Sequence, residues 1–381
     1  MRTGSAATKS IGVFAPLDLS ATRFGDDEVE SPFHVGLPSQ AACWRHHLVP
    51  ELRKDPITGL WVIISGERQR RPNDFRIEQS TLIGGEHCPF CAGHEAMTPP
   101  EVLAFRPTGT PSNGPGWDLR VVPNKFPALQ VEGNLDRQGE GMFDRMNGIG
   151  AHEVIIESPD HAHTLATMSE AHIERVLWAF RERIVDLKRD TRFRFILVFK
   201  NHGAAAGATL EHSHSQLIAL PIVPDFVREE LEGARRHFEA KERCVYCDII
   251  QQEVAADRRV VQENADIVAL SPYAPRFPFE TWLLPRHHGS RFEDAPRSVY
   301  ENLARMLKSV VQRMNRALEN PSYNLVIHSA PFSEPRNDFY HWHVEILPKL
   351  ARVAGFEAGT GFYINPTSPE EATQVLRSVR L

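Results

Sequence analysis

The sequence predicts an α+β protein in which one structural unit occurs twice. Apolar segments of strand length alternate with two long amphipathic helices, and both halves of the chain carry the same series of motifs. Each half has a C-x-x-C pair, then a histidine after a strand, then a helix, then an H-x-H pair. This pattern favours two antiparallel-sheet halves with helices packed on the sheets.

In the first half, "ELRKDPITGLWVIIS" reads as a turn followed by a strand. Further strands are expected at 152–161, 193–202 and 215–223. A helix is expected from Ser169, a suitable N-cap, to Asp190. Its apolar residues recur at helical spacing: Ile173, Val176, Leu177, Phe180, Ile184 and Leu187.

The second half repeats this order, with strands expected at 265–273, 278–288, 323–330 and 341–350. The helix expected at 296–320 has Leu303, Met306, Val310 and Met314 on one stripe. We therefore expect a poorly ordered extension over 1–48, one domain over 49–225 and a second over 226–381.

Composition narrows the class of protein. The 381 residues carry a net charge of -6 and 41% hydrophobic residues, as in a soluble globular protein, and the acidic balance argues against a nucleic-acid binder. No apolar run is long enough for a membrane span, and no secretory signal is visible. We expect a cytoplasmic protein without membrane or nucleic-acid partners, whose cysteines bind metal rather than form disulfides.

Each C-x-x-C pair can join two histidines of its own half in a tetrahedral zinc site. The predicted ligands are Cys88, Cys91, His161 and His212 in the first site, and Cys244, Cys247, His288 and His341 in the second. Of the neighbours His287 and His288, only one can face the metal, because side chains alternate along a strand. The alternative is reduced core cysteines beside unrelated histidines.

The stretch "NHGAAAGATLEHSHSQ", Asn201 to Gln216, can be read in three ways: a metal site, a catalytic nucleophile, or a strand with polar residues on its wet face. On a strand, His212, His214 and Gln216 face one way. If His212 binds zinc, His214 is free to act beside a run of small residues whose backbone N–H groups can approach a phosphate. A neutral imidazole is a good nucleophile toward phosphorus.

This stretch resembles the active-site segment of the galactose-1-phosphate uridylyltransferases, a branch of the histidine-triad superfamily. The segments "RKDPITGLWVIISGERQRRP", "CPFC", "VVPNKFPAL", "ESPDH" and "GFEAGTGFYINP" resemble the same family, so the resemblance covers about residues 51 to 378. It implies two histidine-triad-like units and a homodimer with active sites near the subunit interface.

The resemblance also implies a ping-pong uridylyl transfer, in which His214 attacks UDP-glucose and galactose 1-phosphate takes the nucleotide from the histidine. Gln216 stands where hydrolases of the superfamily have a third histidine and would hold phosphoryl oxygens without assisting water. The residues that match substrate-contacting positions are Arg68, Arg71, Asn124, Asn201, Gly207, Thr209, Phe356 and Glu357. This activity belongs to galactose metabolism and uses a UDP-hexose and a hexose 1-phosphate.

Two departures leave alternatives open. The second cysteine pair implies two zinc ions per chain, whereas some relatives hold iron through a Glu/His set in the second half. Tyr363 stands where some members have a glutamine on the hexose side, and the pattern with two cysteine pairs also occurs in an ADP-glucose phosphorylase, which uses phosphate as acceptor. A zinc-stapled nucleotide-binding protein without chemistry is the alternative of a different class. His343 is the second-half counterpart of His214. No glycine-rich segment that could bind a phosphate precedes it, so we expect a degenerate site there.

Overall fold

The computed structural model describes residues 50–66, 87–107, 109–332 and 338–381. Every described residue belongs to one compact unit, His46–Leu381. The extension predicted over 1–48 lies outside the described residues. Within them, no helix combines the length and the apolar character needed to cross a membrane.

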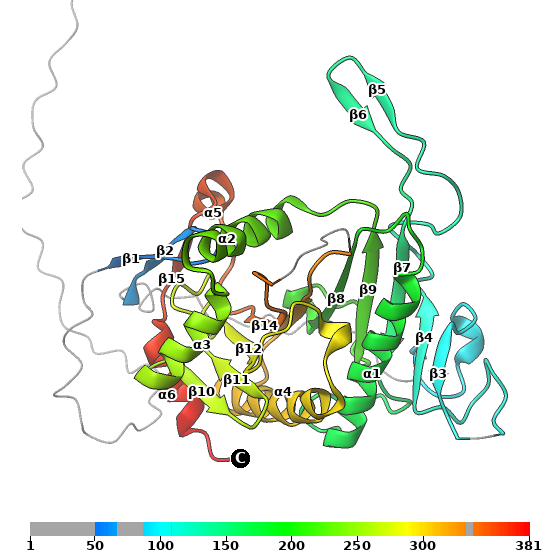
Figure 1. The fold of residues 1–381 in the computed structure, drawn as a ribbon. Helices are drawn as coiled ribbons and strands as arrows, with labels where there is room; N and C mark the ends of the chain where they lie inside the picture. Colours follow the sequence, from blue (N-terminus) through cyan, green and yellow to red (C-terminus); the bar gives the residue numbers. More distant parts are fainter. Residues whose placement is uncertain (1–49, 67–86, 108, 333–337) are drawn as a thin grey trace, which may run out of the picture. The chain divides into compact units, whose positions relative to one another are not determined.

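A ten-stranded antiparallel sheet forms the centre of the described unit (Figure 1). The first half supplies β3 (Leu103–Phe105), β4 (Leu119–Pro123), β7 (Ala151–Ile156), β8 (Phe195–His202) and β9 (His214–Leu220). The second half supplies β10 (Val260–Glu263), β11 (Ile267–Leu270), β12 (Thr281–Pro285), β13 (Tyr323–His328) and β14 (His343–Pro348). The strand order is β10-β11-β12-β14-β13-β8-β9-β7-β4-β3.

This order is symmetric about its middle, so the predicted duplication and the α+β class are confirmed. In chain order, β3, β4, β7, helix α1 (Glu170–Leu187), β8 and β9 correspond to β10, β11, β12, helix α4 (Arg297–Ala317), β13 and β14. The two antiparallel halves join into one continuous sheet, because β8 pairs with β13 from Tyr323↔His202 to Ile327↔Val198.

The two long helices cover one face of this sheet, as predicted, and pack against each other. Helix α1 begins where expected, because the Ser169 hydroxyl accepts the His172 backbone N–H at 3.2 Å. The predicted stripes are buried, from Ile173 to Ile184 on α1 and from Leu303 to Met314 on α4. Leu187, at the end of the α1 stripe, is partly buried against the same core.

Two further helices cover the second half on the opposite face: α2 (Asp225–Lys241) and α3 (Val245–Ala256). Helix α2 occupies the stretch after the "ALPIVP" strand where the domain boundary was expected. Its buried residues Val227, Leu231 and Ala234 belong to the same cluster as Leu284 of β12. The segment between the repeats is therefore part of the second-half core.

The remaining elements lie outside the large sheet. Strands β1 (Glu51–Lys54), β2 (Trp61–Ile64) and β15 (Tyr363–Asn365) form a three-stranded sheet, and β5 (Gln138–Glu140) and β6 (Phe143–Arg145) form a hairpin that projects from the first half (Figure 1). The sequence segment 51–65 thus forms two strands around its turn. Helices α5 (Gly355–Thr360) and α6 (Pro369–Ser378) flank β15 in the chain, and short 3-10 turns lie at Glu95–Met97, Ala204–Ala206 and Phe292–Asp294.

Candidate active site and metal centres

The structure brings the four predicted ligands of the first metal set together, with ligand atoms within 4.8 Å of one another. Nδ1 of His212 lies 3.6 Å from Sγ of Cys88 and 3.5 Å from Sγ of Cys91, and Nδ1 of His161 lies 3.4 Å from Sγ of Cys91. Tetrahedral zinc with ordinary bond lengths places such ligand atoms about 3.6 Å apart. The donors and their spacing therefore fit zinc.

The protonation chemistry of this set also fits a cation. The Nε2–H of His212 donates to the Ser158 carbonyl at 2.7 Å, which leaves the Nδ1 lone pair facing the sulfurs. Burial, and then the neighbouring Cys88, raises the pKa of Cys91 to about 11. A divalent cation would offset this cost, because both thiolates could then bind it.

The second predicted set repeats this arrangement in the second half. Sγ of Cys247 lies 3.6 Å from Nδ1 of His288 and 3.6 Å from Nδ1 of His341, and Cys244 completes the group. His341 donates through Nε2 to the Pro285 carbonyl at 3.0 Å, as His212 does to Ser158. Of the adjacent histidines, His288 is the one that the structure places in the group.

A third group, Glu230, His328 and His343, was not predicted from the sequence. The Glu230 carboxylate is fully engaged by protein donors: Tyr246 at 2.5 Å and Tyr340 at 2.9 Å on Oε1, and His328 at 3.2 Å on Oε2. Burial alone would lower the pKa of His328, but Glu230 and then Glu345 raise it to about 10. The group is thus a charge-compensated network that needs no additional ion to balance Glu230.

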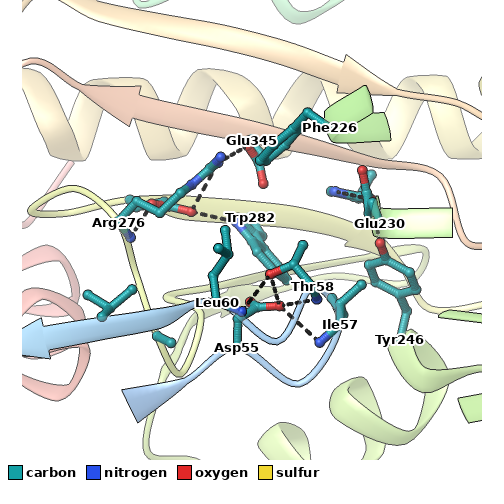
Figure 2. A pocket seen from close by; sticks show the side chains of 14 residues that line it. Asp55, Ile57, Thr58, Leu60, Phe226, Glu230, Tyr246, Arg276, Trp282 and Glu345 are labelled. Atoms are coloured by element: carbon teal, nitrogen blue, oxygen red, sulfur yellow. Dashed lines mark hydrogen bonds and ion pairs between the residues drawn. The ribbon is translucent and has the colours of Figure 1, made fainter. Parts of the chain in front are cut away.

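Figure 2 shows the pocket beside this network. The turn containing Asp55 and Leu60, together with Phe226, reaches over β12 and β14, and the remaining cavity of about 30 Å³ has room for only a few waters. Arg276 adds an ion pair with Glu345 at 2.5 Å. The position beside His343 is therefore filled by protein and is too small for a nucleotide.

His214 begins β9 on the face away from α1, and it is 6% exposed. Its Nδ1–H donates to the His212 carbonyl at 2.7 Å, so Nε2 carries the lone pair. Burial, and then the Lys200 ammonium, lowers the pKa of His214, which favours the neutral ring near pH 7. The ring also contacts Phe90, with 5.3 Å between centroids. This arrangement holds an imidazole lone pair available for attack.

Gln216 is oriented by His152, a residue that the sequence reading missed. The backbone N–H of Ala128 donates to Nδ1 of His152 at 3.1 Å, so the neutral ring carries its proton on Nε2 and donates to Oε1 of Gln216 at 2.8 Å. This leaves the Gln216 NH₂ group available to donate to a phosphate oxygen. Asn124 lies against the same ring, with 3.1 Å between its Nδ2 and Nε2 of His152.

We predict that His152→Phe lowers the rate of nucleotidyl transfer about tenfold, because Gln216 loses the donor that orients it. Steady-state kinetics of the purified variant measure this effect. His237→Phe is the matched control, because His237 pairs with Asp248 in the second-half helices. Equal rates for His152→Phe and the wild type would show that His152 does not orient Gln216.

The small-residue segment forms a tight loop between β8 and β9. Gly203 and Gly207 have φ angles of 79° and 87°, values that favour glycine. Asn324 of the second half braces this loop by donating to Oδ1 of Asn201 at 2.8 Å and to the Ala206 carbonyl at 2.9 Å. The backbone N–H groups of Ala206, Gly207 and Ala208 donate within the loop and fix its shape, so its other backbone N–H groups can face an anion from a fixed position.

We predict that Gly203→Ala destabilises the protein by about 2 kcal/mol and lowers activity at least tenfold. A Cβ there would lie 2.2 Å from the Ser322 hydroxyl, on a backbone that L-residues rarely adopt. Thermal unfolding and transfer kinetics test both effects. Gly139→Ala, where the nearest atom would be 3.5 Å away and φ is not positive, should change neither quantity.

The remaining residues predicted to contact the substrate do not all lie in one part of the structure. Gly207 and Thr209 are exposed on the loop between β8 and β9, which we call the cradle loop. Arg68 and Arg71 lie outside the described residues. Phe356 is 44% exposed on α5, and Glu357 accepts the Ala354 backbone N–H at 3.0 Å and so caps this helix. Helix α5 packs against β15. Asn124 thus lies beside His152, the partner of Gln216, and Asn201, Gly207 and Thr209 lie in the segment from the end of β8 to β9, whereas Phe356 and Glu357 belong to a separate part of the fold.

The fold and this site define a class of enzyme, the nucleotidyltransferases, and the comparisons with known proteins agree. Residues 40–224 match the N-terminal domain of galactose-1-phosphate uridyl transferase, and residues 230–379 match its C-terminal domain. The chain belongs to the galactose-1-phosphate uridylyltransferase family.

Two curated relatives carry different activities in their names. An ADP-glucose phosphorylase of Arabidopsis thaliana is 39% identical over 87% of this chain and 93% of its own length. A galactose-1-phosphate uridylyltransferase of Thermotoga maritima is 29% identical over 87% of this chain and 99% of its own length.

Two solved structures are also similar to this chain. A crystal structure of the Arabidopsis thaliana ADP-glucose phosphorylase with bound ADP-glucose has a TM-score of 0.75 and 38% identity, and covers 87% of this chain and all of that one. A uridylyltransferase structure has a TM-score of 0.67 and 26% identity, over 87% of this chain and 98% of that one. The names of these proteins thus give two different activities.

Proposed function

We propose that this protein transfers a nucleoside monophosphate through a covalent intermediate on His214. The observation that carries the proposal is the His214 ring, whose Nδ1–H is held by the His212 carbonyl at 2.7 Å so that Nε2 is the nucleophile. The cradle loop, which contains Gly203 and Gly207, and the Gln216 amide both lie at the N-terminal end of β9. Together they supply a nucleophile and donors for the phosphoryl oxygens.

The proposed reaction has two balanced steps. Nε2 of His214 attacks the α-phosphorus of a nucleotide sugar, the bond to the bridging oxygen breaks, and hexose 1-phosphate leaves with that oxygen. An acceptor phosphate oxygen then attacks the phosphorus and returns the bonding pair to Nε2. Gln216 donates to the phosphoryl oxygens, and its amide is not a base that could take a proton from water, which favours survival of the intermediate.

We propose ADP-glucose as the donor and inorganic phosphate as the acceptor, which makes the protein an ADP-glucose phosphorylase. This choice is supported by the higher identity to the ADP-glucose phosphorylase, both in sequence and among the solved structures. The two cysteine pairs and "GTGFYINP" are the features that pointed to this alternative in the sequence. It reverses the order of the two activities expected from the sequence alone.

The second candidate is transfer of UMP from UDP-glucose to galactose 1-phosphate. It is supported by the match of both halves to the uridyl transferase domains and by the relatives that carry that name. The two candidates share the His214 chemistry and differ in base and acceptor.

One experiment separates the candidates and the alternative without chemistry. The protein is incubated with ADP-glucose or UDP-glucose labelled at the α-phosphorus. We expect acid-labile label on the protein from ADP-glucose, with glucose 1-phosphate released, and its discharge by phosphate. Label from UDP-glucose, discharged by galactose 1-phosphate, would support the second candidate instead. Binding of nucleotide without label would reject both.

We propose that zinc fills both Cys₂His₂ sets, since thiolate and imidazole donors in this geometry favour zinc. Zinc supplies structural cross-links here and no reacting group. Iron in the second half is disfavoured because Glu230 is already satisfied by protein donors. All four cysteines of these sets are free thiols, which suits the reducing cytoplasm that we propose as the compartment.

We further propose a homodimer in which α5 of one subunit faces the cradle loop, between β8 and β9, of the other subunit. The support is that Phe356 is 44% exposed, while α5 packs against β15 in the second-half part of the chain. Sedimentation of the wild type, and loss of activity without loss of zinc in Phe356→Ala, test this proposal. A fully active monomer would reject it.

A further inference from the structure

A buried polar network lies directly behind His214, on the other face of β9. It consists of Glu157, Lys200, Ser213 and Ser215, and we call it the Lys200 network. The Lys200 ammonium donates to Oε2 of Glu157 at 2.8 Å, to the Ser213 hydroxyl at 3.0 Å and to the His214 carbonyl at 2.9 Å. The hydroxyls of Ser213 and Ser215 donate to the two Glu157 oxygens, at 2.6 Å and 2.5 Å.

The surroundings of the network are apolar. Glu157, Lys200 and Ser215 line a small cavity together with core residues of α1 and α4, such as Phe180 and Leu307. Glu157 is 0% and Lys200 2% exposed. Removing two charges from water costs several kcal/mol per ion, and replacing a buried ion pair by apolar side chains is often neutral or stabilising. Stability of the fold is therefore a weak reason for this pair.

The second half provides an internal comparison. Phe199 pairs with Gln216 as Val326 pairs with Glu345, so Ile327 occupies the place of Lys200. In the same alignment Trp342 corresponds to Ser213 and Val344 to Ser215. In the first half, Glu157 directly follows β7. At the corresponding place in the second half, strand β12 ends with the apolar residues Leu284 and Pro285. The same strands and the same H-x-H segment thus form over an apolar core in the second half, where the pocket beside His343 has room for only a few waters.

We propose that the Lys200 network positions the His214 imidazole for in-line attack. This inference rests on the proposed function of His214. The network fixes the backbone on both sides of the nucleophile: Lys200 holds the His214 carbonyl, and Glu157 holds the hydroxyls of Ser213 and Ser215. With Nδ1 held by the His212 carbonyl, the ring has one orientation. Displacing a reacting group by about 1 Å can cost roughly a hundredfold in rate.

The test uses the double variant Glu157→Gln/Lys200→Met, which removes both charges and keeps similar side-chain volumes. We measure the single-turnover rate at which label passes from α-labelled ADP-glucose to the protein, over a range of donor concentrations. UDP-glucose replaces ADP-glucose if it is the donor. Zinc content and thermal midpoint are measured on the same samples. We expect the maximal rate to fall about 10- to 100-fold while the half-saturating donor concentration changes less than about threefold. The zinc content should equal that of the wild type, and the thermal midpoint should be equal to that of the wild type or higher.

The matched control is Glu253→Gln/Arg259→Met, which removes another buried ion pair, 2.6 Å long, in the second half. It should leave the maximal rate unchanged. A wild-type rate in the Glu157→Gln/Lys200→Met variant would overturn the positioning role. A fall in rate that is matched by lost zinc, or by an equal fall in the control, would also overturn it by indicating a structural role. Absence of label on the wild type would instead overturn the proposed function itself.

Discussion

His214→Ala is expected to lower transfer by at least about 10⁴-fold, because it removes the group that we propose forms the covalent bond. The protein should still fold and hold its metal, since His214 is not part of the Cys88 set. The measurement is steady-state transfer with α-labelled donor, alongside metal content and thermal unfolding.

The control for this variant is His343→Gln, which changes the residue at the same place in the second repeat. His343 lies beside a cavity too small for a nucleotide, so the activity per folded molecule should remain that of the wild type. If His343→Gln lost transfer and His214→Ala retained it, the assignment of the two halves would be reversed. Retention of transfer by both variants would reject histidine catalysis at either place.

The second large effect is expected from breaking the two metal sets one at a time. Cys88→Ser and Cys244→Ser should each lower bound zinc from two equivalents to one, and lower the thermal midpoint by roughly 10 °C or more. Cys88→Ser should also lower activity per folded molecule, because His212 carries the carbonyl that holds His214 at 2.7 Å. Cys244→Ser should leave that activity nearly unchanged.

Elemental analysis and kinetics on matched amounts of folded protein distinguish these variants. Two equivalents of metal in either variant would contradict the ligand sets. Equal losses of activity in the two would contradict the link from the first metal set to the nucleophile, and leave the metals with a purely structural role. Iron in the wild type would mean that the metal assignment of the second half is wrong.

The duplicated pattern was sufficient to predict most of the central fold. Strands such as β8 and β14 are apolar runs, and α4 has its apolar residues on one stripe, so local periodicity determines them. Two C-x-x-C pairs in matching order were enough to find both candidate metal sets. The pairing of β8 with β13 was not predictable, because it joins strands of different repeats that share no local signal.

The parts that were missed depend on distant partners. Glu230 meets His328 and Tyr340 only through packing of α2 against the second half. Lys200, on β8, and Glu157, directly after β7, are charged residues, which sequence patterns place at the surface, yet they pair in the core. His152 is two residues from Val154, which pairs with Gln216, and only the register of β7 with β9 brings His152 and Gln216 near each other.

A nucleotide bound covalently to His214 is tested most directly by the mass of the intact protein after incubation with donor and no acceptor. We predict a gain of one nucleoside monophosphate per chain, mapped by peptide analysis to His214, with one equivalent of hexose 1-phosphate released and the adduct removed when acceptor is added. An unmodified protein that still converts donor and acceptor to products, or an adduct on any other residue, would contradict this account.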